Sequence, residues 1–165
     1  MSLGEHRVER GRREQPEPGV RVLVADDNDT VRTLYLGLLR GVAGVSSVVA
    51  AEDGHDALLL ARSLSCQIVL LDFHMPRIDG VDAALRLRRE RPSTRVAVQS
   101  SDPDSLEARA AGLGLVLFDK LDFERVLAWV ALQVAAWERR GPAPAAQPAP
   151  RREFSCSSCG YGIVG

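Results

Sequence analysis

Short apolar runs alternate with segments of helical periodicity along most of this chain, and no other feature limits the fold as much. The run 67–71, QIVLL, is almost entirely apolar, as in a strand that is buried on both faces of a sheet. Apolar patterning predicts further strands at 21–25, 45–50, 95–99 and 115–118, and helices at 28–40, 53–64, 81–90, 102 to about 112, and 122–139. Five strand–helix repeats predict an α/β fold in which a five-stranded, parallel, doubly wound sheet carries helices on both faces.

Length and charge exclude several classes of protein. The 165 residues fit one such domain with additional segments at its ends. A net charge of −1 argues against direct DNA binding, which calls for a basic surface. No apolar run approaches the roughly 18 residues of a membrane span, and the first 19 residues lack the apolar centre of a signal peptide. We therefore expect a cytoplasmic protein that does not enter a membrane.

Three segments flank the α/β pattern, which occupies residues 20–140. Residues 1–19 are rich in arginine and glutamate, contain two prolines, and are predicted to be a disordered tail. Residues 141–150, GPAPAAQPAP, are predicted to be an extended Pro/Ala linker. Residues 151–165 contain the pair Cys156 and Cys159, whose C-x-x-C spacing resembles one knuckle of a zinc ribbon.

A structural zinc site takes four ligands, and this pair offers two. Three arrangements therefore remain open for Cys156 and Cys159. Two chains share one Zn²⁺ in a homodimer, or a longer gene product completes the ribbon, or the pair is a dithiol without metal. The third cysteine, Cys66, is expected to be a small core or edge residue.

Acidic residues follow two of the predicted strands. Asp26 and Asp27 come after the first strand, and Asp72 comes after the third. In the common doubly wound order 2-1-3-4-5 these strands are neighbours, so the three carboxylates meet at the carboxyl edge of the sheet. Carboxylates this close repel one another, and oxygen ligands in a small, water-accessible site indicate Mg²⁺.

Two further functional groups are expected at the same edge. Ser100 ends the fourth strand and Lys120 ends the fifth. Lys120 is the only lysine among 21 basic residues, which indicates a position that needs a compact ammonium group. Carboxylates, a hydroxyl and an ammonium around a metal ion are suited to phosphoryl transfer, in which a carboxylate attacks phosphorus and the cations neutralise the phosphoryl oxygens.

Four stretches in this register resemble the receiver domain of two-component response regulators: RVLVADDND, IVLLDFHMPRIDG, VAVQSS and LFDK. The resemblance covers about residues 21–140 and implies a flavodoxin-like sheet. It implies that Asp72 is the phosphoacceptor and takes a phosphoryl group from a histidine kinase or a phosphotransfer protein. It also implies a single-domain regulator that signals by protein–protein contact with a target that the sequence does not identify, and not an enzyme with a separate substrate.

The resemblance implies a role for each residue of the site. Asp27 and Asp72 bind Mg²⁺ directly with the backbone carbonyl of His74, and Asp26 binds it through water. Ser100 donates a hydrogen bond to the phosphoryl group, and Lys120 pairs with that group. His74 and Asp102 occupy the two variable positions that tune the lifetime of the phosphoryl group.

Two positions depart from the family pattern. Leu117 stands where the family often has an aromatic residue that moves inward with the hydroxyl, and strand alternation points the adjacent Phe118 to the opposite face. Leu121 follows Lys120 where many members have proline. The first departure argues against aromatic switching in this chain.

A second interpretation makes the chain a phosphatase. The sequence DNDTV at 27–31 also fits the first motif of haloacid dehalogenase-like phosphatases, with Asp27 as nucleophile and Asp29 as acid. Ser100 and Lys120 would then bind phosphate. This alternative leaves Asp72 and its Met-Pro loop unexplained, and it requires another acidic pair after Lys120 that the chain does not supply.

Overall fold

The computed structural model describes residues 19–141, so the predictions for the two ends of the chain, including Cys156 and Cys159, lie outside the described residues. The strands are β1 (Val20–Ala25), β2 (Val45–Ala51), β3 (Ile68–Asp72), β4 (Arg95–Ser100) and β5 (Val116–Asp119). The helices are α1 (Asp29–Arg40), α2 (Gly54–Ser63), α3 (Gly80–Glu90), α4 (Pro103–Ala110) and α5 (Phe123–Arg140). Within this range no helix is long and apolar enough to cross a membrane.

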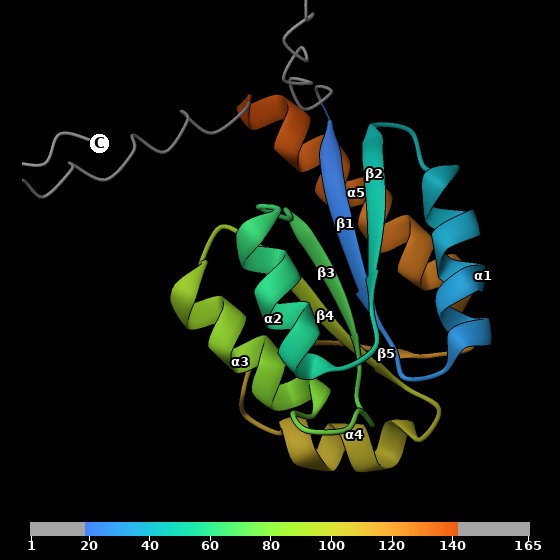
Figure 1. The fold of residues 1–165 in the computed structure, drawn as a ribbon, viewed down its shortest axis with the longest axis vertical. Helices are drawn as coiled ribbons and strands as arrows, with labels where there is room; N and C mark the ends of the chain where they lie inside the picture. The colour runs from blue at the N-terminus through green and yellow to red at the C-terminus, as the bar shows by residue number, and fades with distance from the viewer. Residues whose placement is uncertain (1–18, 142–165) are drawn as a thin grey trace, which may run out of the picture.

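The five strands form one parallel sheet in the order β2-β1-β3-β4-β5, which confirms the predicted topology. Helices α1 and α5 cover one face of this sheet, and α2, α3 and α4 cover the other (Figure 1). The central strand β3 is buried along its whole length, because helices pack on both of its faces. Each face of the sheet therefore has its own apolar core.

Aspartate and asparagine side chains begin all five described helices. Asn28, Asp53, Asp79, Asp102 and Asp122 each accept a hydrogen bond from a backbone N–H in the first turn of the helix that follows. Most acidic residues between a strand and a helix in this protein are thus caps. Asp26, Asp27 and Asp72 lie outside this group and need a different explanation.

The boundaries around β5 differ from the prediction. Helix α4 ends at Ala110, before the expected position near 112, and β5 begins one residue later than expected. The connection contains two glycines, Gly112 and Gly114, in the left-handed region with φ of 72° and 61°. Lys120 lies just after the strand, and its N–H donates to the carbonyl of Ser100 over 2.9 Å. This bond holds Lys120 at the carboxyl edge of the sheet.

Gln99 places an amide group without hydrogen-bond partners in the core, and its cost to stability can be measured. It is buried in β4, on the face covered by α1 and α5, and neither its amide oxygen nor its nitrogen bonds to a described residue. A buried amide without partners costs about 1–3 kcal/mol. We therefore expect Gln99→Leu to raise the free energy of unfolding by about 1–2 kcal/mol in urea titrations.

Gln67 provides the matched control, because its side-chain oxygen accepts the N–H of Arg21 over 2.7 Å. Gln67→Leu removes that acceptor and should lower stability by about 1 kcal/mol. Equal destabilisation by the two substitutions would contradict the assignment of Gln99 as an unpaired group.

Candidate functional site

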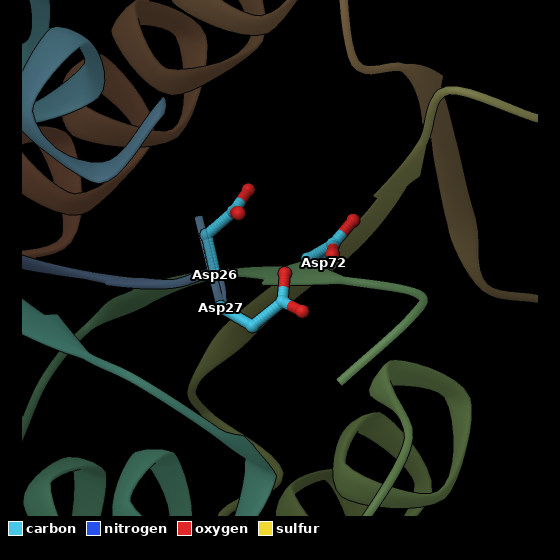
Figure 2. Close-up of side chains that lie close together, drawn as sticks. All are labelled: Asp26, Asp27 and Asp72. Atoms are coloured by element: carbon cyan, nitrogen blue, oxygen red, sulfur yellow. The ribbon is translucent and has the colours of Figure 1, made fainter. Parts of the chain in front are cut away.

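Three carboxylates meet at the carboxyl edge of the sheet, as the strand order predicts. Asp26 and Asp27 follow β1, and Asp72 ends the neighbouring strand β3 (Figure 2). Carboxylate oxygens from the three residues lie within 4.8 Å of one another. Asp26 and Asp72 are buried, whereas Asp27 is exposed, so the group opens to solvent on the side of Asp27.

The ammonium group of Lys120 bridges two of these carboxylates. Its Nζ lies 2.8 Å from Oδ2 of Asp26 and 3.1 Å from Oδ1 of Asp72. The backbone of Lys120 is held at both ends, because its N–H donates to Ser100 and its carbonyl accepts from the hydroxyl of Tyr35 over 3.2 Å. The predicted role of Lys120 as a fixed positive charge at this edge therefore has a structural basis.

Contacts within the protein already occupy both carboxylate oxygens of Asp26. Oδ1 accepts the N–H of Asn28 over 2.9 Å, and Oδ2 pairs with Lys120. Asp27 and the second oxygen of Asp72 have no such partner among residues 19–141. Asp27 and Asp72 are therefore the two carboxylates with oxygens available to a metal ion or a substrate.

Burial sets the charge state of Asp72. Removal from water and the neighbouring carboxylate of Asp26 raise the pKa of Asp72 to about 6, against the opposing effect of Lys120. Burial disfavours the charge on Lys120, but the hydrogen bonds that its ammonium group donates to Asp26 and Asp72 outweigh this effect and raise the pKa of this lysine. Lys120 is therefore charged at neutral pH, and burial makes the ionisation of Asp72 costly.

A glycine lets the loop after β3 pass close to Asp72. A Cβ built on Gly80, the first residue of α3, would lie 2.2 Å from the carbonyl oxygen of Asp72. The same loop is tied to α2, because the guanidinium of Arg77 pairs with Asp53 and lies 3.6 Å from Asp56. Arg77 has a left-handed backbone with φ of 67°. The loop is thus held at Arg77 and at Gly80, which both follow the Met-Pro sequence.

Ser100 ends β4, and the two predicted modulator positions, His74 and Asp102, follow β3 and β4 at the same edge of the sheet. The buried Oγ of Ser100 accepts the N–H of Asp102 over 3.0 Å, and its own proton has no acceptor among the described residues. The side chain of Asp102 is exposed and caps α4 through Ser105, which lowers the pKa of Asp102. His74 is also exposed, and its ring lies 4.3 Å from that of Phe73.

The two departures from the family pattern have clear structural outcomes. Leu117 packs into the core on the side of α2, α3 and α4, while Phe118 lies on the other face and contacts Trp129 edge-on at 5.8 Å. This confirms that Phe118 does not substitute for an aromatic residue at 117. The bond between Lys120 and Leu121 is trans.

Two supporting residues were missed in the sequence. Arg32 of α1 donates to the carbonyl of Asp26 over 2.7 Å and pairs with Asp29 at 3.0 Å. Tyr35, one turn later, holds Lys120 through its hydroxyl. Helical periodicity predicted Tyr35 as a core residue and gave no sign of the hydrogen bond from its hydroxyl. For Arg32, the i,i+3 spacing from Asp29 was the one indication of an ion pair.

The phosphatase alternative gains no support from this geometry. It requires Asp29 beside Asp27 as a proton donor. Asp29 instead lies in the first turn of α1, is exposed, and pairs with Arg32. The three clustered carboxylates include Asp72 and omit Asp29.

The donor set suits Mg²⁺. The available groups are carboxylate oxygens, which this hard cation prefers, and they lie at an edge that is open to water. A divalent cation would also offset the repulsion that raises the pKa of Asp72. Such an acidic pocket is the feature by which receiver domains bind Mg²⁺.

Comparison with known proteins agrees with the geometry. The family model of the response regulator receiver domain matches residues 22–130. Response regulator GacA of Pseudomonas protegens is 41% identical over 99 residues, which are 56% of this chain and 46% of that protein. Protein-glutamate methylesterase/protein-glutamine glutaminase 2 of Burkholderia thailandensis is 31% identical over 150 residues, 84% of this chain and 42% of that protein.

Among solved structures, the signal receiver domain of NarL from Mycobacterium tuberculosis is similar, with a TM-score of 0.62 and 29% identity over 72% of this chain and 97% of that one. The chain spans less than half the length of the two curated relatives described above. The family match extends over more than half of this chain and includes every residue of the acidic edge. The chain belongs to the response regulator receiver domain family and is the receiver domain of a two-component response regulator.

Proposed function

We propose that Asp72 is the phosphoacceptor and that the donor is a phosphohistidine on a kinase or a phosphotransfer protein. The observation that carries this proposal is the position of the Lys120 ammonium, 2.8 Å from Asp26 and 3.1 Å from Asp72. Among the three clustered carboxylates, only Asp72 has both a cation beside it and an oxygen left for attack. Asp26 lacks the free oxygen, and Asp27 lacks the cation.

Asp27, Asp72 and the backbone carbonyl of His74 are the groups that would hold Mg²⁺, with Asp26 contributing through water. When bound, Mg²⁺ neutralises phosphoryl oxygens and favours the ionised form of Asp72. The free oxygen of Asp72 forms the new O–P bond as the N–P bond of phosphohistidine breaks, and the departing imidazole takes up a proton. Lys120 offsets the charge on the transferred group, and the free hydroxyl proton of Ser100 is placed to donate to one of its oxygens.

We further propose that the phosphorylated domain acts through protein contact and has no chemistry beyond its own phosphorylation and dephosphorylation. Phosphorylation biases the segment around β4 and β5, which carries Ser100 and Lys120. As a switch the domain gains affinity for a target when it is phosphorylated. As a relay it loses its phosphoryl group to a histidine protein.

His74 and Asp102, exposed beside the site, are proposed to set the lifetime of the phosphoryl group.

Acetyl phosphate provides a donor that needs no partner protein. The purified chain, incubated with acetyl phosphate and Mg²⁺, should gain one phosphoryl group in an intact-mass spectrum. Asp72→Ala and chelation of Mg²⁺ should each remove the adduct. Ser100→Ala should lower the extent of phosphorylation at early times by roughly tenfold, because one hydrogen-bond donor to the developing charge is lost.

Asp29→Ala is the matched control. Asp29 is an exposed acid in the first turn of α1, and among the described residues its side chain pairs with Arg32 alone. This variant should accept phosphate like the parent. An adduct that survives Asp72→Ala, or steady phosphate release that depends on Asp27 and Asp29, would reject the proposal and support a phosphatase.

The contribution of Asp72 to the stability of the metal-free protein should fall as the pH rises toward neutrality. The pKa of Asp72 is about 6 in the folded chain and near its ordinary value of 3.8 in the unfolded chain, so the folded state binds the extra proton between these values. The free energy of unfolding therefore falls as the pH rises through this range, by roughly 3 kcal/mol in total, and the loss is complete above pH 6.

Urea titrations with a chelator at about pH 4.5 and about pH 7.5 measure about 2 kcal/mol of this loss. Asp72→Asn supplies the reference, because its amide does not ionise and the other carboxylates stay. The stability of the parent should fall relative to Asp72→Asn between the two pH values. A difference between the two proteins that is independent of pH would contradict the charge state derived for Asp72.

The cysteine pair Cys156 and Cys159 stays a prediction. Zinc content and native mass separate its three arrangements. One Zn²⁺ per two chains in a dimer indicates a shared site. A monomer without zinc fits either a dithiol or a ribbon that a longer product completes, and replacing both cysteines by serine should then leave the mass and metal content unchanged.

A further inference from the structure

A groove lies at the amino-terminal end of the sheet, away from the acidic edge. Its main part is a cavity of about 520 Å³ between the starts of β4 and β5, the end of α3 and the middle of α5. A smaller cavity of about 40 Å³ continues it toward the last turn of α5, and the two share Arg95 and Gln133. The larger volume is within the range of ligand-binding pockets, roughly 300–1,000 Å³.

Two tryptophans form the apolar wall of this groove. Trp129 lines the large cavity and Trp137 lines the small one, with Gln133 between them at i+4 spacing on one face of α5. Each indole is half-buried and packs on the core, so one side of each ring is fixed and the other side remains accessible. Rings held in this way can pack against the apolar pyrrolidine rings of proline.

The polar groups that line the groove are mostly hydrogen-bond donors. Three guanidinium groups contribute, from Arg88, Arg95 and Arg140, together with the amide of Gln133. Arg88 already donates to the carbonyls of Leu113 and Gly114. No carboxylate is among the described residues that line either cavity. The groove therefore matches a ligand that offers carbonyl oxygens and few N–H groups.

We propose that the groove binds the Pro/Ala segment of the same chain, residues 142–150. This segment, PAPAAQPAP, has four prolines and no charged residue. Proline lacks the N–H, and the polyproline helix makes no internal hydrogen bonds, so its carbonyls are free to accept from arginine and glutamine. Its rings pack against indoles, as Pro-rich segments do in aromatic grooves.

The segment begins where the groove ends. Arg140 lines the small cavity and is the last residue of α5, and the chain continues through Gly141, whose φ of 71° allows a change of direction. Trp129 lies about 17 Å back along the helix axis at 1.5 Å per residue. A Pro-rich chain of nine residues can extend over roughly 28 Å, which is enough to turn and reach it.

Covalent linkage favours this occupant over a partner from solution. A short tether gives the segment an effective concentration in the millimolar range, so even weak contacts fill the groove. An acidic peptide would also match the arginines, but it would have to displace the tethered segment. The docked segment would then limit access of other proteins to this end of the domain.

Tryptophan fluorescence tests the proposal in the full chain, because Trp129 and Trp137 are its only tryptophans. A variant with serine in place of Pro142, Pro144, Pro148 and Pro150 should release the segment. Its emission should shift to longer wavelength, and its acrylamide quenching constant should rise by roughly twofold as the indoles meet water. Replacing Pro16 and Pro18 by serine, at the other end of the chain, is the matched control and should change neither.

A substitution within the groove provides the second arm. Arg95→Ser should produce the same exposure of the indoles, and its effect should not add to that of the proline variant, since both break one interaction. Circular dichroism and the melting temperature should match the parent, which excludes unfolding as the cause.

Equal quenching in the parent and the proline variant would overturn the proposal and leave the groove to an external partner. Protection of the indoles that is lost on dilution would overturn it as well, because it would assign the bound segment to a second copy of the chain.

Discussion

The ion pairs of Lys120 hold the acidic edge together. One ammonium group lies between Asp26 at the end of β1 and Asp72 at the end of β3, and it is delivered from the residue that follows β5. Without it, two buried carboxylates would face each other with no compensating charge, which is strongly destabilising. The same contact joins three strands at the place where the phosphoryl group is proposed to arrive, so stability and function depend on one interaction.

The rest of the fold positions this contact. Parallel strands bring their carboxyl ends to one edge, and the two helical layers cover the two faces of the sheet. Tyr35 and Arg32 of α1 fix the backbones of Lys120 and Asp26. The site is therefore preorganised by hydrogen bonds that come from outside it, while Asp27 and one oxygen of Asp72 are left open.

Sequence patterns predicted a parallel, doubly wound sheet, and the order 2-1-3-4-5 that is common in such sheets then predicted the meeting of the three carboxylates. They did not predict that Tyr35 supports the site. Its ring follows the apolar pattern of the core, while its hydroxyl donates a hydrogen bond to the carbonyl of Lys120. They placed β5 one residue early, since two left-handed glycines lengthen the preceding turn. Contacts between distant residues, such as Arg77 with Asp53, leave no periodic signal.

The central claim is that Asp72, and no other carboxylate of the cluster, carries the phosphoryl group. Borohydride reduction of the phosphorylated chain converts an aspartyl phosphate into homoserine, and peptide mass spectrometry then locates the converted position. The account predicts homoserine at position 72, with Asp26 and Asp27 unchanged. Conversion at position 27 would contradict it and would favour the phosphatase chemistry that the geometry does not support.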